Sequence, residues 1–218
     1  MTARRLRISR SRAEEPLTDG GSETAGTLVG IATRDGILLA ADTRTSQGTV
    51  VRSERVQKLA QVHPTAAMGS TDHLGVMQSF VRTIRLEADR YETDRGDPMT
   101  LPELSTVAAE KLRAESESGT FVLGGVDADG SHVFCLRPDG GVLEDEFVAV
   151  GSGQEIATGV LEAEATDSLP MAEARRVAGR ALASSAERDA LTGVGVRIAE
   201  ITAAGVETAD YESVDELL

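Results

Sequence analysis

The stretch TLVGIATRDGILLAADT, residues 27–43, decides how this chain folds. It holds two apolar runs joined by Arg34-Asp35-Gly36, and an Asp-Gly pair between such runs is the strongest short-range signal for a β-hairpin. Both runs are mostly apolar, so we expect both strands to be largely buried. Residues 1–26 before them are charged and then small and polar, which predicts a flexible leader or propeptide.

Downstream, the hydrophobic pattern changes period twice. Apolar residues at three- and four-residue spacing predict a helix from residue 74 to the Arg-Gly-Asp-Pro at 95–98, and a second helix after Thr100. Two more helices are predicted in residues 155–165 and 171–189. Further strands are predicted in residues 50–62, 65–70, 120–127, 131–138, 142–151, 193–202 and 206–211.

This order of elements predicts an α+β protein of one domain. Strands grouped in runs favour antiparallel sheets, and helices that arrive in pairs favour a helical layer on each outer face. We therefore expect a four-layer α-β-β-α sandwich with two antiparallel sheets between helical layers. The expected domain spans residues 27–211, followed by an acidic tail at 212–218.

Composition excludes several classes of function. A net charge of −14 argues against nucleic-acid binding, because phosphate would be repelled. Lys58 and Lys111 are the only lysines beside 36 Asp and Glu residues, a balance that suggests a high-salt source, although an ordinary acidic protein remains the alternative. No segment reads as a secretory signal or membrane span, and the single Cys135 permits no internal disulfide, so we expect a cytoplasmic protein.

Four segments together resemble the β-type subunits of the proteasome, which are N-terminal-nucleophile hydrolases. They are the opening TLVGIATRDGILLAADTRTSQG at 27–48, QKLAQV at 57–62, GSGQEIATGVLE at 151–162 and ERDALTGVGVRIAEIT at 187–202. Any one of them would be weak alone, but their order and spacing cover essentially all of residues 26–210. The resemblance implies the same sandwich fold, assembly into seven-membered rings, and peptide-bond cleavage by an N-terminal threonine.

The resemblance also implies the residues of a catalytic site. Thr27 would be the nucleophile, activated by its own freed α-amino group, with Asp42 orienting Lys58 beside it. Lys58 is the most informative of these, because the chain uses arginine nearly everywhere else and a bulky planar guanidinium could not replace a titratable ammonium. The matched positions that would surround the nucleophile and its amine are Ser152, Asp189 and Thr192.

Each of these residues has a simpler explanation as well. Lys58 could be a surface lysine beside a strand, and Asp42 a carboxylate in a turn. Ser152, Asp189 and Thr192 could each serve as helix caps or turn residues.

By the same resemblance, a pocket would hold the substrate residue that precedes the scissile bond. It carries no strong charge, which favours a neutral or apolar preference, and its lining residues would be Thr45, Val56, Ala60, Ser70, Leu74 and Gln78. Implied partners are α-type subunits, other β-type subunits and an ATP-dependent unfoldase, with unfolded polypeptide as substrate. We expect no cofactor and no metal, since His63, His73 and His132 are scattered, and neither nucleic acid nor a membrane as partner.

Two residues depart from the family pattern. Counting back from Val29 and Gly30 without a gap places Gly26 at the nucleophile position, and Asp72 stands where the family has a glycine whose N–H serves the oxyanion. Three hypotheses remain open: a threonine-type endopeptidase that uses Thr27, a catalytically silent β-type subunit with a structural role in a ring, and a related N-terminal-nucleophile amidase.

Overall fold

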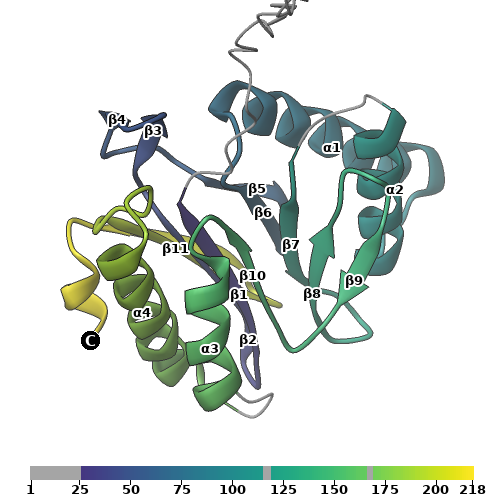
Figure 1. The fold of residues 1–218 in the computed structure, drawn as a ribbon. Coiled ribbons are helices and arrows are strands. Elements are labelled where there is room, and N and C mark those ends of the chain that lie inside the picture. Colours follow the sequence, from purple (N-terminus) through teal and green to yellow (C-terminus); the bar gives the residue numbers. More distant parts are fainter. Residues whose placement is uncertain (1–25, 115–118, 166–168) are drawn as a thin grey trace, which may run out of the picture.

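The computed structural model describes residues 26–114, 119–165 and 169–218, and it confirms the predicted sandwich. In Figure 1 two five-stranded sheets lie face to face, with α1 and α2 covering one and α3 and α4 covering the other. Residues 1–25 of the predicted leader lie outside the described residues. Within those residues, no helix is long and apolar enough to cross a membrane.

The first sheet has the strand order β10-β1-β2-β11-β12, and all its pairs are antiparallel. Its strands are β1 (Thr27–Thr33), β2 (Gly36–Asp42), β10 (Phe147–Gly151), β11 (Val196–Thr202) and β12 (Gly205–Tyr211).

The second sheet has the order β5-β6-β7-β8-β9, also antiparallel. Its strands are β5 (Leu59–His63), β6 (Ala66–Ser70), β7 (Phe121–Val126), β8 (Ser131–Leu136) and β9 (Val142–Glu144). A separate two-stranded hairpin is formed by β3 (Thr45–Gln47) and β4 (Val50–Ser53).

The helices are α1 (Leu74–Arg95), α2 (Leu101–Ala114), α3 (Gln154–Glu164) and α4 (Met171–Arg188). The segment expected as an acidic tail forms a short 3₁₀ helix, η1 (Val214–Leu217), whose Val214 and Leu217 are buried against α4 and its neighbours. Two apolar side chains between the carboxylates of this segment are thereby removed from water.

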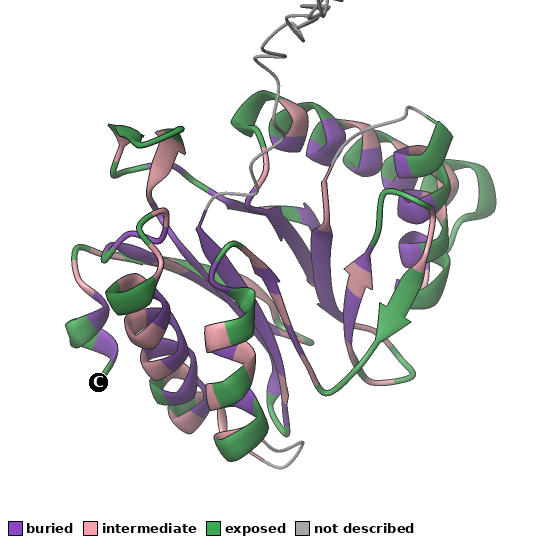
Figure 2. Cartoon of the chain, viewed as in Figure 1, coloured by how far each residue is buried: buried purple, intermediate pink, exposed green. Residues whose placement is uncertain are grey.

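The first hairpin is central because both its faces are covered (Figure 2). Val29 and Ile31 pack among the buried residues of α3 and α4, whereas Leu28 and Leu39 pack between the two sheets. Side chains alternate between the faces of a strand, so two apolar faces require a nearly continuous apolar sequence. This is the physical reason why residues 27–42 read as two uninterrupted runs.

Two predicted strands are divided. The run at 50–62 forms β4 of the separate hairpin and β5 of the second sheet. The run at 142–151 breaks at Asp145 and Glu146, so that β9 pairs with β8 in the second sheet and β10 pairs with β1 in the first. The chain therefore passes from one sheet to the other at the two carboxylates, which stay exposed.

The tight turn of the first hairpin predicts a measurable stability effect. Gly36 has φ of 147°, and a Cβ there would lie 2.0 Å from the carbonyl oxygen of Ile201. Gly36→Ala should therefore lower the free energy of unfolding by at least about 1–3 kcal/mol in urea titrations, and more if the backbone cannot shift. The matched control is Gly205→Ala, where φ is 137° but the nearest atom, the oxygen of Pro64, is 3.7 Å away. Equal costs at both positions would contradict the steric explanation.

Candidate functional site

The candidate site lies at one end of the first sheet, where several chain segments converge. Asp42 ends β2, Lys58 directly precedes β5, Ser152 follows β10, and Asp189 follows α4. The structure therefore brings the predicted residues together, although up to 165 positions separate two that are hydrogen-bonded.

Asp42 is the centre of this arrangement. Its side chain is completely buried and accepts four hydrogen bonds. Its Oδ1 accepts from the Lys58 ammonium at 2.7 Å and from the Thr27 amide at 2.8 Å. Its Oδ2 accepts from the amides of Arg44 at 2.9 Å and Gly193 at 2.8 Å. Four donors fix this buried carboxylate in position.

Lys58 is nearly buried as well, with 5% of its surface exposed. Burial lowers the pKa of its ammonium below the usual value, and the neighbouring carboxylate of Asp42 opposes that shift. The simpler explanation of Lys58 as a surface residue is thus wrong. Asp42 does lie at the end of β2, as the turn explanation requires, but its side chain is wholly buried and paired with Lys58.

A second group of polar side chains surrounds Asp189. Ser152 Oγ and Thr192 Oγ1 both donate to Asp189 Oδ2 at 2.6 Å, and Ser152 Oγ accepts from the amide of Gly26 at 3.0 Å. Because the Thr192 proton is used on Asp189, the hydroxyl of Thr27 must be the donor in its 2.7 Å contact with Thr192 Oγ1.

The position of Thr27 decides what this site can do. Thr27 is wholly buried, and its Oγ1 lies so close to Gly153 that a Cβ on that glycine would come within 2.2 Å. Its side chain thus points to the same face of the sheet as Val29 and Ile31, toward α3 and α4.

A side chain at residue 26 would point to the opposite face of the sheet from that of Thr27. A Cβ built on it would lie 2.3 Å from Lys58 Nζ and 2.2 Å from Asp42 Oδ1. Residue 26, which has no side chain, therefore occupies the place beside the ammonium, and Thr27 does not.

The expected oxyanion position is also altered. The amide of Asp72 donates to Ser70 Oγ at 3.2 Å, and its carboxylate accepts from the amide of Thr120 at 3.2 Å. The carboxylate thus reaches the amide just before β7, and the Asp72 amide, which stands where the family has the oxyanion donor, has an internal partner.

Arg44 is a site residue that the sequence analysis did not assign to the site. Its Nη1 donates to the carbonyl oxygens of Ala190 at 3.0 Å and Thr192 at 3.1 Å, and its Nε to Glu54 at 3.2 Å. It ties the segment after Asp42 to the loop that carries Thr192. The sequence signal that could have assigned Arg44 to the site was its position two residues after Asp42 in the matched segment at 27–48.

The six residues expected to form a substrate pocket are only partly gathered. Ala60 and Gln78 line one groove of about 350 Å³ beside α1, whereas Val56 lines another of about 650 Å³. Ser70 is buried and donates to the carbonyl oxygen of Thr120 at 2.9 Å. The remaining two, Thr45 on β3 and Leu74 at the start of α1, line neither groove.

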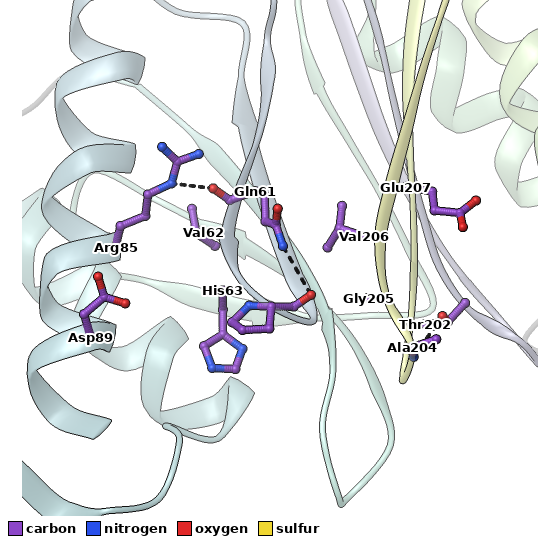
Figure 3. Close-up of a pocket in the computed structure, with 11 residues that line it drawn as sticks. Gln61, Val62, His63, Arg85, Asp89, Thr202, Ala204, Gly205, Val206 and Glu207 are labelled. Atoms are coloured by element: carbon purple, nitrogen blue, oxygen red, sulfur yellow. Dashed lines mark hydrogen bonds between the residues drawn. The ribbon is translucent and has the colours of Figure 1, made fainter. Parts of the chain in front are cut away.

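A groove of about 710 Å³ lies at the opposite end of the sandwich (Figure 3). It runs between α1, the end of β5 and the β11–β12 turn, and Arg85 Nε donates there to the Gln61 carbonyl oxygen at 2.6 Å. None of the predicted site residues lines it.

Cys135 and the histidines offer no alternative centre. Cys135 is half-buried on β8, and burial raises the pKa of its thiol, which disfavours the reactive thiolate. Across the described part of the chain, no cluster of three or more His, Cys, Asp or Glu residues could hold a metal ion.

Comparison with known proteins identifies similar sequences. A family model described as "Proteasome subunit" matches residues 22–201. "Proteasome subunit beta" of Halobacterium salinarum is 42% identical over 207 residues, covering 92% of this chain and 84% of the relative. "Proteasome subunit beta 2" of Haloarcula marismortui is 43% identical over 198 residues, covering 88% and 86%. Such relatives come from halophilic archaea, in keeping with the acidic composition.

Proposed function

The chain belongs to the proteasome subunit family, and we propose that, as a β-type subunit of the core particle, it fills a ring position without cleaving peptide bonds. One observation carries the proposal: residue 26, whose Cβ would face Lys58 and Asp42, is glycine. Without a hydroxyl at that place, the ammonium has no nucleophile to activate.

The orientation of Thr27 supports the proposal further. A substrate carbonyl could reach the buried hydroxyl of Thr27 only if the start of β1 changed its conformation. The strand register would have to shift by one residue to bring residue 27 to the face of residue 26. The engaged amide of Asp72 would in addition leave a tetrahedral oxyanion short of a donor, a loss that typically reduces kcat by about 10²–10³-fold.

The remaining site residues then have structural roles in this proposal. Asp42 and Lys58 join the two sheets, and Ser152, Asp189 and Thr192 hold the segment around Gly26 and Thr27. The relatives named above are all proteasome β subunits, so the amidase hypothesis gains no support.

For partners and location, we propose what the family implies. The subunit would assemble with α-type and other β-type subunits into a cytoplasmic core particle, to which an ATP-dependent unfoldase delivers unfolded polypeptide. Its active siblings would perform the hydrolysis.

Retention of the leader is the direct test. Intact-mass measurement on assembled particles should show wild type, Thr27→Ala and Lys58→Arg all beginning upstream of Gly26, with equal, background-level peptide hydrolysis. The physical reason is that self-processing needs the same nucleophile as catalysis. A wild-type protein that begins at Thr27, combined with an uncut Thr27→Ala variant, would instead establish the endopeptidase hypothesis.

A further inference from the structure

The groove of about 710 Å³ in Figure 3 has the form of a small-molecule site. Its walls are α1, the end of β5 with the turn to β6, and the β11–β12 turn. Val62, Pro64 and Val206 line it with apolar surface, and Arg85 and Asp89 of α1 add charges. A cleft of roughly 300–1,000 Å³ that combines apolar surface with a few charged groups is the usual site of a small ligand.

Arg85 is fixed across this groove. Its Nε donates to the Gln61 carbonyl oxygen at 2.6 Å, so that the side chain extends from α1 to β5 (Figure 3). The Gln61 side-chain amide in turn donates to the carbonyl oxygen of Pro64 at 3.3 Å. The two Nη groups of Arg85 have no partner among the described residues. A guanidinium that is held at one nitrogen, with its other N–H groups free, is ready to bind a carboxylate.

Asp89 lies one helical turn after Arg85, and its carboxylate likewise makes no ion pair within the described part of the chain. Opposite charges at this spacing on a helix are neighbours and can pair. Arg90 and Asp94, at the same spacing on the same helix, do pair, at 3.8 Å. Arg85 does not pair with Asp89, because its guanidinium is bound to Gln61 on the opposite wall. One unpaired cation and one unpaired anion therefore line the same groove.

The other titratable residues of the lining do not neutralise these two charges. His63 is half-buried, and burial lowers the pKa of its imidazole, against the opposing effect of the carboxylates of Glu92 and Asp89. The ring is therefore neutral at about pH 7. The carboxylate of Glu207 points away from α1 in Figure 3. The charges beside α1 are thus one positive and one negative.

We propose that this groove binds a small zwitterion, an α-amino acid with an apolar side chain. The ligand carboxylate binds the guanidinium of Arg85, its ammonium binds the carboxylate of Asp89, and its side chain packs on Pro64 and Val206. An amino acid completes both ion pairs at once, whereas a molecule with a single charge leaves one of the two residues unpaired. None of the residues around Asp42 lines the groove, so the site does not depend on whether the subunit cleaves peptides.

Binding of L-leucine and two of its analogues tests the proposal. 4-Methylpentanoate lacks the ammonium of leucine, and 3-methylbutylamine lacks its carboxylate. In saturation-transfer NMR on the full chain at constant ionic strength, leucine should bind with a Kd of roughly 1 mM, which is within reach of a ligand of about ten heavy atoms. Each analogue should bind about three- to tenfold more weakly, because one ion pair is lost.

Two substitutions should remove these preferences separately. In Arg85→Gln, leucine should bind no better than 3-methylbutylamine, and in Asp89→Asn it should bind no better than 4-methylpentanoate. Both side chains are exposed, so thermal unfolding should stay near that of wild type. A substitution that only altered the shape of the groove would instead weaken all three ligands equally.

The matched controls are Arg90→Gln and Asp94→Asn, which change the same residue types at the same spacing on α1 but outside the groove. Both should bind leucine like wild type. Three results would each overturn the inference: leucine that binds no better than its analogues, equal losses in the control variants, or no binding at roughly 50 mM leucine, far above the expected Kd.

Discussion

A chain that begins at residue 26 with threonine in place of glycine should hydrolyse peptides. The Gly26→Thr chain would be produced behind a removable fusion, so that its α-amino group is free. We expect its rate of peptide hydrolysis to exceed that of the matched chain beginning at Gly26 by at least about 10³-fold. The reason is positional: a Cβ at this residue faces Lys58 Nζ and Asp42 Oδ1, while Ser152 Oγ already accepts from the amide nitrogen.

Removing the leader matters for this result. In the intact chain Gly26 has φ of 90°, which disfavours a β-branched residue, and the added Cβ would collide with the ion pair. A free amino terminus has no preceding peptide plane, so residue 26 can turn to relieve the contact.

Two additional variants sharpen the experiment. Adding Asp72→Gly should raise the rate further, because the side chain that holds this segment to Thr120 is lost and the amide of residue 72 can then turn from Ser70 toward the developing oxyanion. Adding Lys58→Ala should abolish the gain. If Gly26→Thr stays at background while its fold and assembly match wild type, the proposed nucleophile position is wrong.

The second large effect concerns stability. Asp42→Asn should lower the free energy of unfolding by about 3–5 kcal/mol, because it leaves the Lys58 ammonium buried without its counter-charge. Asparagine also turns a donor toward groups that are themselves donors, since Asp42 accepts from three backbone amides and one ammonium.

A double-mutant cycle isolates the ion pair. Lys58→Met should cost less than Asp42→Asn, because the carboxylate keeps its three amide donors. The double variant should cost clearly less than the sum of the two single variants. The half-exposed pair of Lys111 and Glu87, with a 2.6 Å contact, is the matched control, and Glu87→Gln should cost below about 1 kcal/mol. Additive costs at Asp42 and Lys58 in urea titrations would contradict a coupled buried pair.

The sequence alone determined most of the fold. Apolar runs around Asp35-Gly36 required a hairpin covered on both faces, and the grouping of strands and paired helices required two sheets between helical layers. The resemblance to β-type proteasome subunits also indicated Asp42 and Lys58 as partners, and the retention of a lysine in an arginine-rich chain supported the role of Lys58. The signals for the fold are local or compositional, so no three-dimensional information was needed to read them.

Only the tertiary structure decided which way the decisive side chains point. That residues 26 and 27 lie on opposite faces follows from strand geometry, but the face that meets Lys58 depends on the pairing of β1 with β2 and β10 and on the packing of one sheet on the other. The hydrogen bond from the Asp72 amide to Ser70 and the passage between sheets at Asp145 likewise arise from contacts between distant segments. A pattern of residue types specifies burial and period, whereas the direction of a single hydroxyl is fixed only when its neighbours are in place.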